Sequence, residues 1–344
     1  MRTFPQRLAD EREPLVIAEI AQNHDGSLGM CHAYIDALAD AGADAIKFQT
    51  HIAAEESTLD EQFRVKFSYQ DETRYGYWRR MEFSEPQWRE LKKHADTRGI
   101  EFLSTPFSVA AVELLDRIGV RAWKVGSGDT LSEEMLRAIL ASGKPLVVST
   151  GMSDWDEIDH TAERLAASGS AFALLQCTSK YPTPLTDVGL NNLAEMKGRY
   201  GCRVGLSDHS GSLSPSLAAI ARGFGLVEVH ATFDRRMFGP DVPSSLTVDE
   251  IARLARFARD LQVMDAHPVD KDAMAAELGA QKSLFGKSVA LKQDLPGGHV
   301  LRTEDLTPKK PGTGIPWTER ERIVGRVLKQ DVPRNRLLNV QDLH

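Results

Sequence analysis

The sequence predicts a (β/α)8 TIM barrel followed by a small β-rich C-terminal domain. Eight short apolar runs alternate with polar loops and amphipathic stretches over residues 1–265. The runs are rich in β-branched residues and almost continuously hydrophobic, as parallel strands buried on both faces are. From Ser283 onward the pattern changes to short β-like runs separated by turns rich in Gly and Pro. Eight strand–helix repeats in one domain are typical of a closed barrel.

The eight predicted strands are spaced so that most intervals have room for a helix. They begin at Leu15, Asp44, Glu101, Ala122, Pro145, Ala171, Arg203 and Leu226. Two of the intervening stretches, residues 85–99 and 153–169, have helical periodicity, and the second begins with Ser153 as a candidate N-cap and ends at Gly169. The alternative fold is a doubly wound open sheet, but no G-x-G-x-x-G motif follows the first strand.

One segment departs from this rhythm. Residues 51–83, after the second predicted strand, form a long, polar and aromatic loop. Long excursions within a compact domain are usually functional or disordered, and this one leaves the carboxyl end of a strand, where barrel enzymes place their sites. Together these patterns predict a barrel domain over 1–265, a weakly patterned connection over 266–282 and a separate module over 283–344.

The composition is that of an ordinary water-soluble enzyme. Of the 344 residues, 42% are hydrophobic and 26% are charged, and no apolar run approaches the roughly 20 residues that a membrane span needs. The N-terminus carries charges where a signal peptide would need its apolar stretch, so we expect a cytoplasmic protein. Three cysteines are too few and too scattered for a disulfide framework or a C-x-x-C metal site.

Charge is unevenly distributed along the chain. The net charge of −7 argues against general nucleic-acid binding. The tail from Ser283 nevertheless has 11 Lys and Arg against 7 Asp and Glu. A basic module on an acidic body suits a lid over an anionic substrate, and it equally suits a solvated basic surface.

Polar side chains gather at the carboxyl ends of the predicted strands, where barrel enzymes bind their substrates. They are Glu19, Asn23, His24, Lys47, Gln49, Ser104, Thr105, Lys124, Ser127, Asp129, Ser149, Thr150, Thr178, Ser179, Tyr181, Ser207, Asp208, His209 and His230. Two lysines, several small hydroxyls and Gly-rich turns on one face predict a phosphate site, because ammonium, hydroxyl and backbone N–H groups all serve phosphate oxygens. The alternative for each single Ser is that it caps a helix.

Two histidines, His209 and His230, end the seventh and eighth predicted strands, which are neighbours in a closed barrel. Neighbouring strands bring both imidazoles within reach of one ion, and imidazole nitrogen suits a borderline divalent metal such as Mn²⁺ or Zn²⁺. Two protein ligands would leave positions open to water or substrate, as a catalytic metal requires. The alternative is that each is a hydrogen-bonded structural residue.

A series of motifs covers nearly the whole chain in order. They are IAEIAQNHDGS from Ile17, AGADAIKFQTH from Ala41, IEFLSTPFS from Ile100, KVGSGD from Lys124, GKPLVVSTGMS from Gly143, LLQCTSKYPTP from Leu174, VGLSDHS from Val204, GPD at Gly239–Asp241 and KKPGTGI from Lys309. Together they resemble the sialic acid synthase family, which includes relatives in spore coat polysaccharide, legionaminate and pseudaminate synthesis. The tail is similar to that family's antifreeze-like (SAF) domain.

The resemblance implies a transferase that joins C3 of phosphoenolpyruvate (PEP) to the aldehyde of an open-chain amino sugar, an N-acetylmannosamine-like aldose. Water then adds at C2 and phosphate leaves, which gives a nine-carbon 2-keto-3-deoxy sugar acid. By the same resemblance the PEP ligands are Lys47, Lys124, Ser127, Ser149, Ser179, Tyr181 and Ser207, the sugar contacts are Glu19, Gln49, Asp241 and Lys310, the ligands of Mn²⁺ or Mg²⁺ are His209 and His230, and the catalytic residues are Glu19, Lys124, Asp129 and His230. A homodimer with exchanged SAF domains is also implied.

Two positions depart from the family pattern. The family usually has Glu where this chain has Asp129, and Arg in the tail motif where this chain has Lys310. That Arg would reach the acyl-amino group of the sugar in a dimer partner's site, and Lys cannot reproduce its planar set of donors. These departures concern the sugar more than the reaction.

Two other functions stay open. A phosphosugar-type 3-deoxy keto acid synthase would use similar chemistry, but such enzymes lack the SAF-like tail that begins near Ser283. A non-catalytic sugar-binding homologue would explain the changes at Asp129 and Lys310, although both lysines and both histidines of the predicted site are retained.

Overall fold

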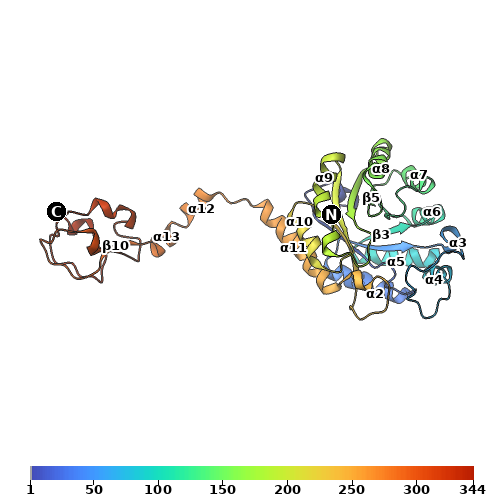
Figure 1. Ribbon diagram of the computed structural model, residues 1–344, viewed down its shortest axis with the longest axis horizontal. Helices are drawn as coiled ribbons and strands as arrows, with labels where there is room; N and C mark the ends of the chain where they lie inside the picture. Colours follow the sequence, from blue (N-terminus) through green and yellow to red (C-terminus); the bar gives the residue numbers. More distant parts are fainter. Residues whose placement is uncertain (1) are drawn as a thin grey trace. The chain divides into compact units, whose positions relative to one another are not determined.

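The structure of the protein is a computed structural model that describes residues 2–344 (Figure 1). The chain divides into two compact units, one that ends at Ala266 and one that comprises His267–His344. Within residues 2–344, no helix combines the length and the apolar character that crossing a membrane would require.

The first unit is the predicted (β/α)8 barrel. Its strands are β1 (Leu15–Glu19), β2 (Ala45–Thr50), β3 (Glu101–Pro106), β4 (Trp123–Val125), β5 (Leu146–Ser149), β6 (Phe172–Cys177), β7 (Arg203–Asp208) and β8 (Leu226–Thr232). They are parallel and follow the order β3-β2-β1-β8-β7-β6-β5-β4, and β3 and β4 at the two ends of this order also lie next to each other. The ring of strands is therefore nearly closed, which confirms the prediction.

Helices cover the outside of this ring (Figure 1). The main ones are α2 (Leu28–Ala41), α5 (Glu85–Arg98), α6 (Val109–Ile118), α7 (Glu133–Ala141), α8 (Trp155–Ser168), α9 (Leu190–Tyr200), α10 (Leu213–Ala221) and α11 (Val248–Ala266). The predicted cap Ser153 of α8 is wrong by one residue. The carboxylate of Asp154 accepts the Glu157 N–H and caps the helix, whereas the Ser153 hydroxyl pairs with Thr130. The helix ends as predicted at Gly169, which has a positive φ.

Alternate residues of the strands face the barrel interior and the surrounding helices. Leu15 and Ile17 of β1 belong to an interior apolar cluster, whereas Val16 packs with residues of the helices. The short helix α1 (Phe4–Leu8) adds its own apolar side chains to the interior cluster. The interior is thus apolar at the amino ends of the strands, and it becomes polar at Glu19, the last residue of β1.

The long segment after β2 contains two helices, α3 (Ala53–Glu56) and α4 (Arg74–Met81). The carboxylate of Glu82 accepts the backbone N–H of Ala53 at 2.7 Å, so the two ends of the segment are joined. Between them Phe63, Phe67 and Tyr77 form an aromatic cluster with ring centroids 5.0 to 6.2 Å apart. This segment, residues 51–83, is called the insertion below. A short strand, β9 (Ser245–Thr247), pairs with β8.

The second unit is a small β-rich module, as predicted. Strands β10 (Ser288–Leu291) and β11 (Leu306–Lys309) pair antiparallel around a separate apolar core. The predicted connection over 266–282 is not irregular, because it contains α12 (Lys271–Glu277) and the start of α13 (Gly279–Phe285). Asp270 caps α12 by accepting two backbone N–H groups, and the Ala and Glu residues that follow are good helix formers.

Candidate active site

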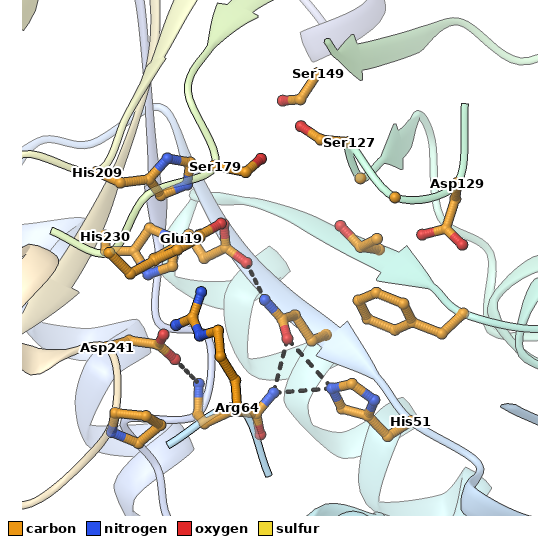
Figure 2. Close-up of a pocket in the computed structure, with 18 of the residues that line it drawn as sticks. Glu19, His51, Arg64, Ser127, Asp129, Ser149, Ser179, His209, His230 and Asp241 are labelled. Atoms are coloured by element: carbon orange, nitrogen blue, oxygen red, sulfur yellow. Dashed lines mark hydrogen bonds and ion pairs between the residues drawn. The ribbon is translucent and has the colours of Figure 1, made fainter. Parts of the chain in front are cut away.

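A cavity of about 770 Å³ opens at the carboxyl ends of the strands, and nearly all the predicted site residues line it. They are Glu19, Lys47, Gln49, Lys124, Ser127, Asp129, Ser149, Ser179, Tyr181, Ser207, His209, His230 and Asp241. Figure 2 shows side chains from several strands and from the loops that follow them turned toward this space. The closed ring brings these positions together from across the sequence.

Two lysines and two glutamates form a buried charge cluster inside the ring. Lys47 Nζ lies 2.7 Å from Glu19 Oε2 and 3.2 Å from Glu228 Oε1, and Lys124 Nζ lies 3.6 Å from the same Glu228 oxygen. Burial opposes the charge on Lys47, but the two carboxylates raise its pKa overall. Burial lowers the pKa of Lys124, whose attraction to Glu228 only partly compensates. Burial would raise the pKa of Glu19, but Lys47 and His230 lower it.

Glu228 was missed by the sequence-based prediction. It lies on β8 two residues before His230, and in the strand register it stands opposite Ser207 of β7. Its side chain is 2% exposed. The signal that could have found it is the alternation along β8, because Glu and His two positions apart among Val and Ala residues must share one face.

Serine hydroxyls form one wall of the cavity. The four predicted ones are Ser127, Ser149, Ser179 and Ser207. Lys124 Nζ donates to the Ser149 hydroxyl at 2.8 Å, and the Ser127 hydroxyl accepts the Gly151 N–H at 2.9 Å. None of the four caps a helix: α7, α8, α9 and α10 begin after other residues. A Cβ atom at Gly151 would stand 2.6 Å from the Ser179 hydroxyl, so this wall requires glycine there.

The two predicted metal-binding histidines are neighbours, with ring centroids of His209 and His230 4.9 Å apart. Burial lowers the pKa of His209 well below its usual value, which keeps its imidazole neutral and able to bind a metal. Nδ1 of His230 is buried and has no hydrogen-bond partner, and its Nε2 lies 3.4 Å from Glu19. The Tyr181 ring packs against both imidazoles. In the described part of the chain, no group of three or more His, Cys, Asp or Glu side chains is arranged to hold a metal ion.

Two aspartates, Asp129 and Asp241, line the cavity from opposite sides (Figure 2). Burial and the carboxylate of Glu56 raise the pKa of Asp129 to about 6. Burial also raises the pKa of Asp241, although His230 acts in the opposite direction. A carboxyl group with a pKa near 6 can hold or release a proton at neutral pH, which suits general acid–base work.

The insertion supplies a large share of the cavity wall. The sequence-based prediction named this segment but not its individual residues. The contributing side chains are His51, Glu56, Glu61, Arg64, Val65, Phe67, Arg74, Tyr77 and Trp78. The guanidinium of Arg64 lies 5.1 Å from the centroid of the Tyr181 ring. The expectation that this long segment serves the site is therefore supported by its position, and its length and aromatic composition were the available signal.

Several polar residues at strand ends do not join the cavity, because their side chains bond within the protein. They are Asn23, His24, Ser104, Thr150, Thr178 and Asp208. These side chains make structural hydrogen bonds instead. Lys310 belongs to the second unit, where its ammonium lies 5.2 Å from the centroid of the Phe285 ring. Its contact with a sugar stays a prediction.

The fold and the site define a (β/α)8 barrel in which two buried lysines and four serines line one cavity together with a histidine pair. A model of the NeuB family matches residues 34–269, and a model of the SAF domain matches residues 286–343. The chain therefore belongs to the NeuB family and carries a C-terminal SAF domain. It is accordingly a transferase of the kind that forms C–C bonds with PEP.

Named relatives agree with this assignment. The chain is 30% identical over 333 residues to N,N'-diacetyllegionaminic acid synthase of Campylobacter jejuni, which covers 95% of this chain and 99% of the relative. It is 33% identical over 310 residues to human N-acetylneuraminate-9-phosphate synthase, which covers 89% and 86%. The solved N-acetylneuraminic acid synthetase of Leptospira borgpetersenii, in complex with citrate, matches with a TM-score of 0.68 at 29% identity, over 79% of this chain and 92% of that one.

Proposed function

We propose that this protein condenses PEP with the aldehyde of an open-chain, N-acylated amino sugar, and releases phosphate to form a nine-carbon 2-keto-3-deoxy sugar acid. The proposal rests on one observation, the convergence of Lys47, Lys124 and four serine hydroxyls in a cavity next to His209 and His230. PEP carries about three negative charges, counting a carboxylate and a phosphate, and taking them out of water requires such donors.

Different residues of the cavity would bind the two substrates. Lys47, Lys124 and the serines would hold the carboxylate and phosphate of PEP, and Asp241 with Gln49 would contact the sugar. C3 of PEP forms a bond with the aldehyde carbon and water adds at C2. One proton of this water goes to the aldehyde oxygen; the other leaves with phosphate when the C2–O bond to phosphate breaks and C2 becomes a carbonyl carbon. Glu19 would order the attacking water, and Asp129 could transfer a proton because its pKa is about 6.

A divalent ion, Mn²⁺ or Mg²⁺, is part of the proposal. The neutral imidazole of His209 and the unpartnered Nδ1 of His230 fit such an ion, and Glu19 lies near them. Because this pair supplies two imidazoles, water or substrate oxygen atoms would complete the coordination. When bound, the ion would polarise the sugar aldehyde and lower the pKa of a bound water.

The test is release of phosphate from PEP by the purified full-length chain with Mn²⁺ or Mg²⁺ and a panel of free and phosphorylated aldoses. Release with N-acylated mannosamine-type sugars is the expected result. Release with phosphorylated sugars alone would instead identify a phosphosugar synthase. Binding of PEP without turnover on any sugar would contradict catalysis and favour a sugar-binding homologue.

The histidine pair has its own test. The variant His209→Ala should lose metal-dependent phosphate release by at least about 100-fold, because half of the protein's imidazole ligands are removed. The matched control is His160→Ala, which changes an exposed histidine on α8. If His209→Ala retained activity and metal dependence like the control, the proposed pair would be wrong.

We also propose a homodimer in which the SAF domain of one chain completes the site of the other through Lys310. Multi-angle light scattering of the full chain should then give twice the mass of one 38.1 kDa chain. A monomeric mass in an active preparation would contradict this arrangement.

A further inference from the structure

A continuous hydrogen-bonded chain links the insertion to Glu19 (Figure 2). Glu56 Oε1 lies 2.7 Å from His51 Nδ1, and His51 Nε2 lies 2.8 Å from Gln22 Nε2. Gln22 Nε2 donates to Gln49 Oε1 at 2.7 Å, and Gln49 Nε2 donates to Glu19 Oε1 at 2.7 Å. All five residues line the cavity. This hydrogen-bonded chain is therefore placed to affect the role of Glu19 in the site.

The polarity of this chain is set from both ends, because each end is a carboxylate oxygen that accepts a hydrogen bond from the neighbouring nitrogen. At one end Gln49 must turn its amide nitrogen toward Glu19, so its oxygen faces Gln22. Gln22 must then present its nitrogen, which lies 2.8 Å from His51 Nε2 and makes this ring nitrogen an acceptor. His51 Nε2 also lies 3.2 Å from Gln49 Oε1, which is the longer of its two contacts. At the other end the Glu56 carboxylate requires a proton on His51 Nδ1. Both ends therefore favour the tautomer of His51 that carries its proton on Nδ1 and accepts at Nε2.

Aromatic packing holds the imidazole in this orientation. The Trp78 ring of α4 lies 4.0 Å from the His51 ring at an interplanar angle of 20°, and Phe107 lies on the other face at 4.6 Å and 5°. The His51 side chain is 3% exposed. A ring confined between two aromatic faces cannot exchange its two nitrogens without moving Trp78, which belongs to the insertion.

We infer that His51 is a positioning residue whose Nδ1-protonated form orients Gln22 and Gln49 so that an amide N–H holds Glu19 Oε1. This leaves Glu19 Oε2 facing Lys47 at 2.7 Å and His230 at 3.4 Å, between the anion site and the histidine pair. With the opposite tautomer, Nε2 would carry the proton and could no longer accept the Gln22 N–H at 2.8 Å, and the Glu56 carboxylate would face an unprotonated Nδ1. As a contribution to turnover, the inference rests on the proposed function.

Kinetics of two variants test the role in turnover. His51→Phe keeps a ring between Trp78 and Phe107 but cannot accept the Gln22 N–H, whereas His51→Gln keeps an acceptor of similar reach. We expect His51→Phe to lower kcat by about 10- to 100-fold with the KM for PEP changed by less than about threefold, as loss of an orienting partner does. We expect His51→Gln to retain more of kcat than His51→Phe does. Unchanged kcat in His51→Phe, or the reverse order of the two variants, would overturn the inference.

Nuclear magnetic resonance tests the tautomer without any need for turnover. In the full chain labelled with ¹⁵N-histidine, the signals absent from both His51→Phe and His51→Gln identify His51 among the 10 histidines. These signals should show Nδ1 protonated and Nε2 free, as the contacts with Glu56 and Gln22 require. A ring protonated on Nε2 would overturn the proposed polarity. If no sugar supported phosphate release, the proposed function would be wrong. The tautomer of His51 would still test the proposed polarity of the hydrogen-bonded chain.

Discussion

Glu228 offers the most direct test of the buried charge cluster, because its single carboxylate serves two lysines. In the variant Glu228→Gln the shape of the side chain is kept and one negative charge is lost. Lys47 retains Glu19 at 2.7 Å, but Lys124 loses the one carboxylate that lies within 4 Å of it in the described part of the chain. Both ammonium groups are almost fully buried, so bulk water cannot replace the missing partner.

The expected loss of stability follows from this geometry. Removing one partner of a buried ion pair costs about 3–5 kcal/mol. We expect the lower end, about 3 kcal/mol, because the Gln amide oxygen can still accept from Lys47, which lies 3.2 Å from the Glu228 oxygen. In a domain of this size each kcal/mol lowers Tm by about 2–4 °C, so the barrel transition should fall by about 6–12 °C. The control Glu133→Gln removes an exposed partner of Arg164 and should stay within about 0.5 kcal/mol of the parent.

The pH dependence of this loss is also fixed in sign. The pKa of Lys124 is already lowered in the folded protein, and removal of Glu228 should lower it further. At pH values between the folded and unfolded pKa of Lys124, the unfolded chain binds more protons than the folded protein does. The free energy of unfolding therefore rises with pH in this range. The difference between Glu228→Gln and the parent should therefore shrink as pH rises from 7 toward the ordinary lysine pKa of about 10.4.

Urea unfolding followed by circular dichroism and tryptophan fluorescence at several pH values measures both effects. Four of the five tryptophans lie in the barrel unit, so fluorescence reports mainly on its unfolding. A Glu228→Gln variant as stable as the parent at pH 7, or a difference that widens with pH, would refute the account of the cluster.

Two further predictions concern the cavity wall and its titration. Gly151→Ala places a methyl group against the side chains of Ser179, Cys177 and Ser127, and should raise the KM for PEP by about tenfold or more at a cost in stability of about 1–3 kcal/mol. An unchanged KM would show that this wall does not contact PEP. The pKa of Asp129 is raised to about 6 in the folded state, so its contribution to stability is full below its unfolded pKa and is lost as pH rises through 6. Asp129→Asn should therefore gain about 1–3 kcal/mol relative to the parent between pH 4 and 7, and parallel stability curves in urea unfolding would contradict this.

Much of the site could be read before the structure because barrel geometry converts sequence position into location. Any polar residue at the carboxyl end of a strand points toward one mouth, so Lys47, Lys124, His209 and His230 could be grouped without knowing a single contact. The same rule wrongly placed Ser104 and Thr150 at the cavity. Their side chains alternate to the outer face or bond to a neighbouring strand, and a shift of one residue decides between cavity and core.

The sequence by itself determined the eight-fold repeat, the SAF-like tail and the chemical types gathered at the strand ends, since these follow from local periodicity and motif order. Only the tertiary structure decided which charges meet. That Glu228 lies between two lysines, and that Trp78 and Phe107 enclose His51, depends on side chains from distant segments packing within a few ångströms. Burial at that distance sets pKa values and hydrogen-bond polarity, because electrostatic interactions strengthen as water is excluded.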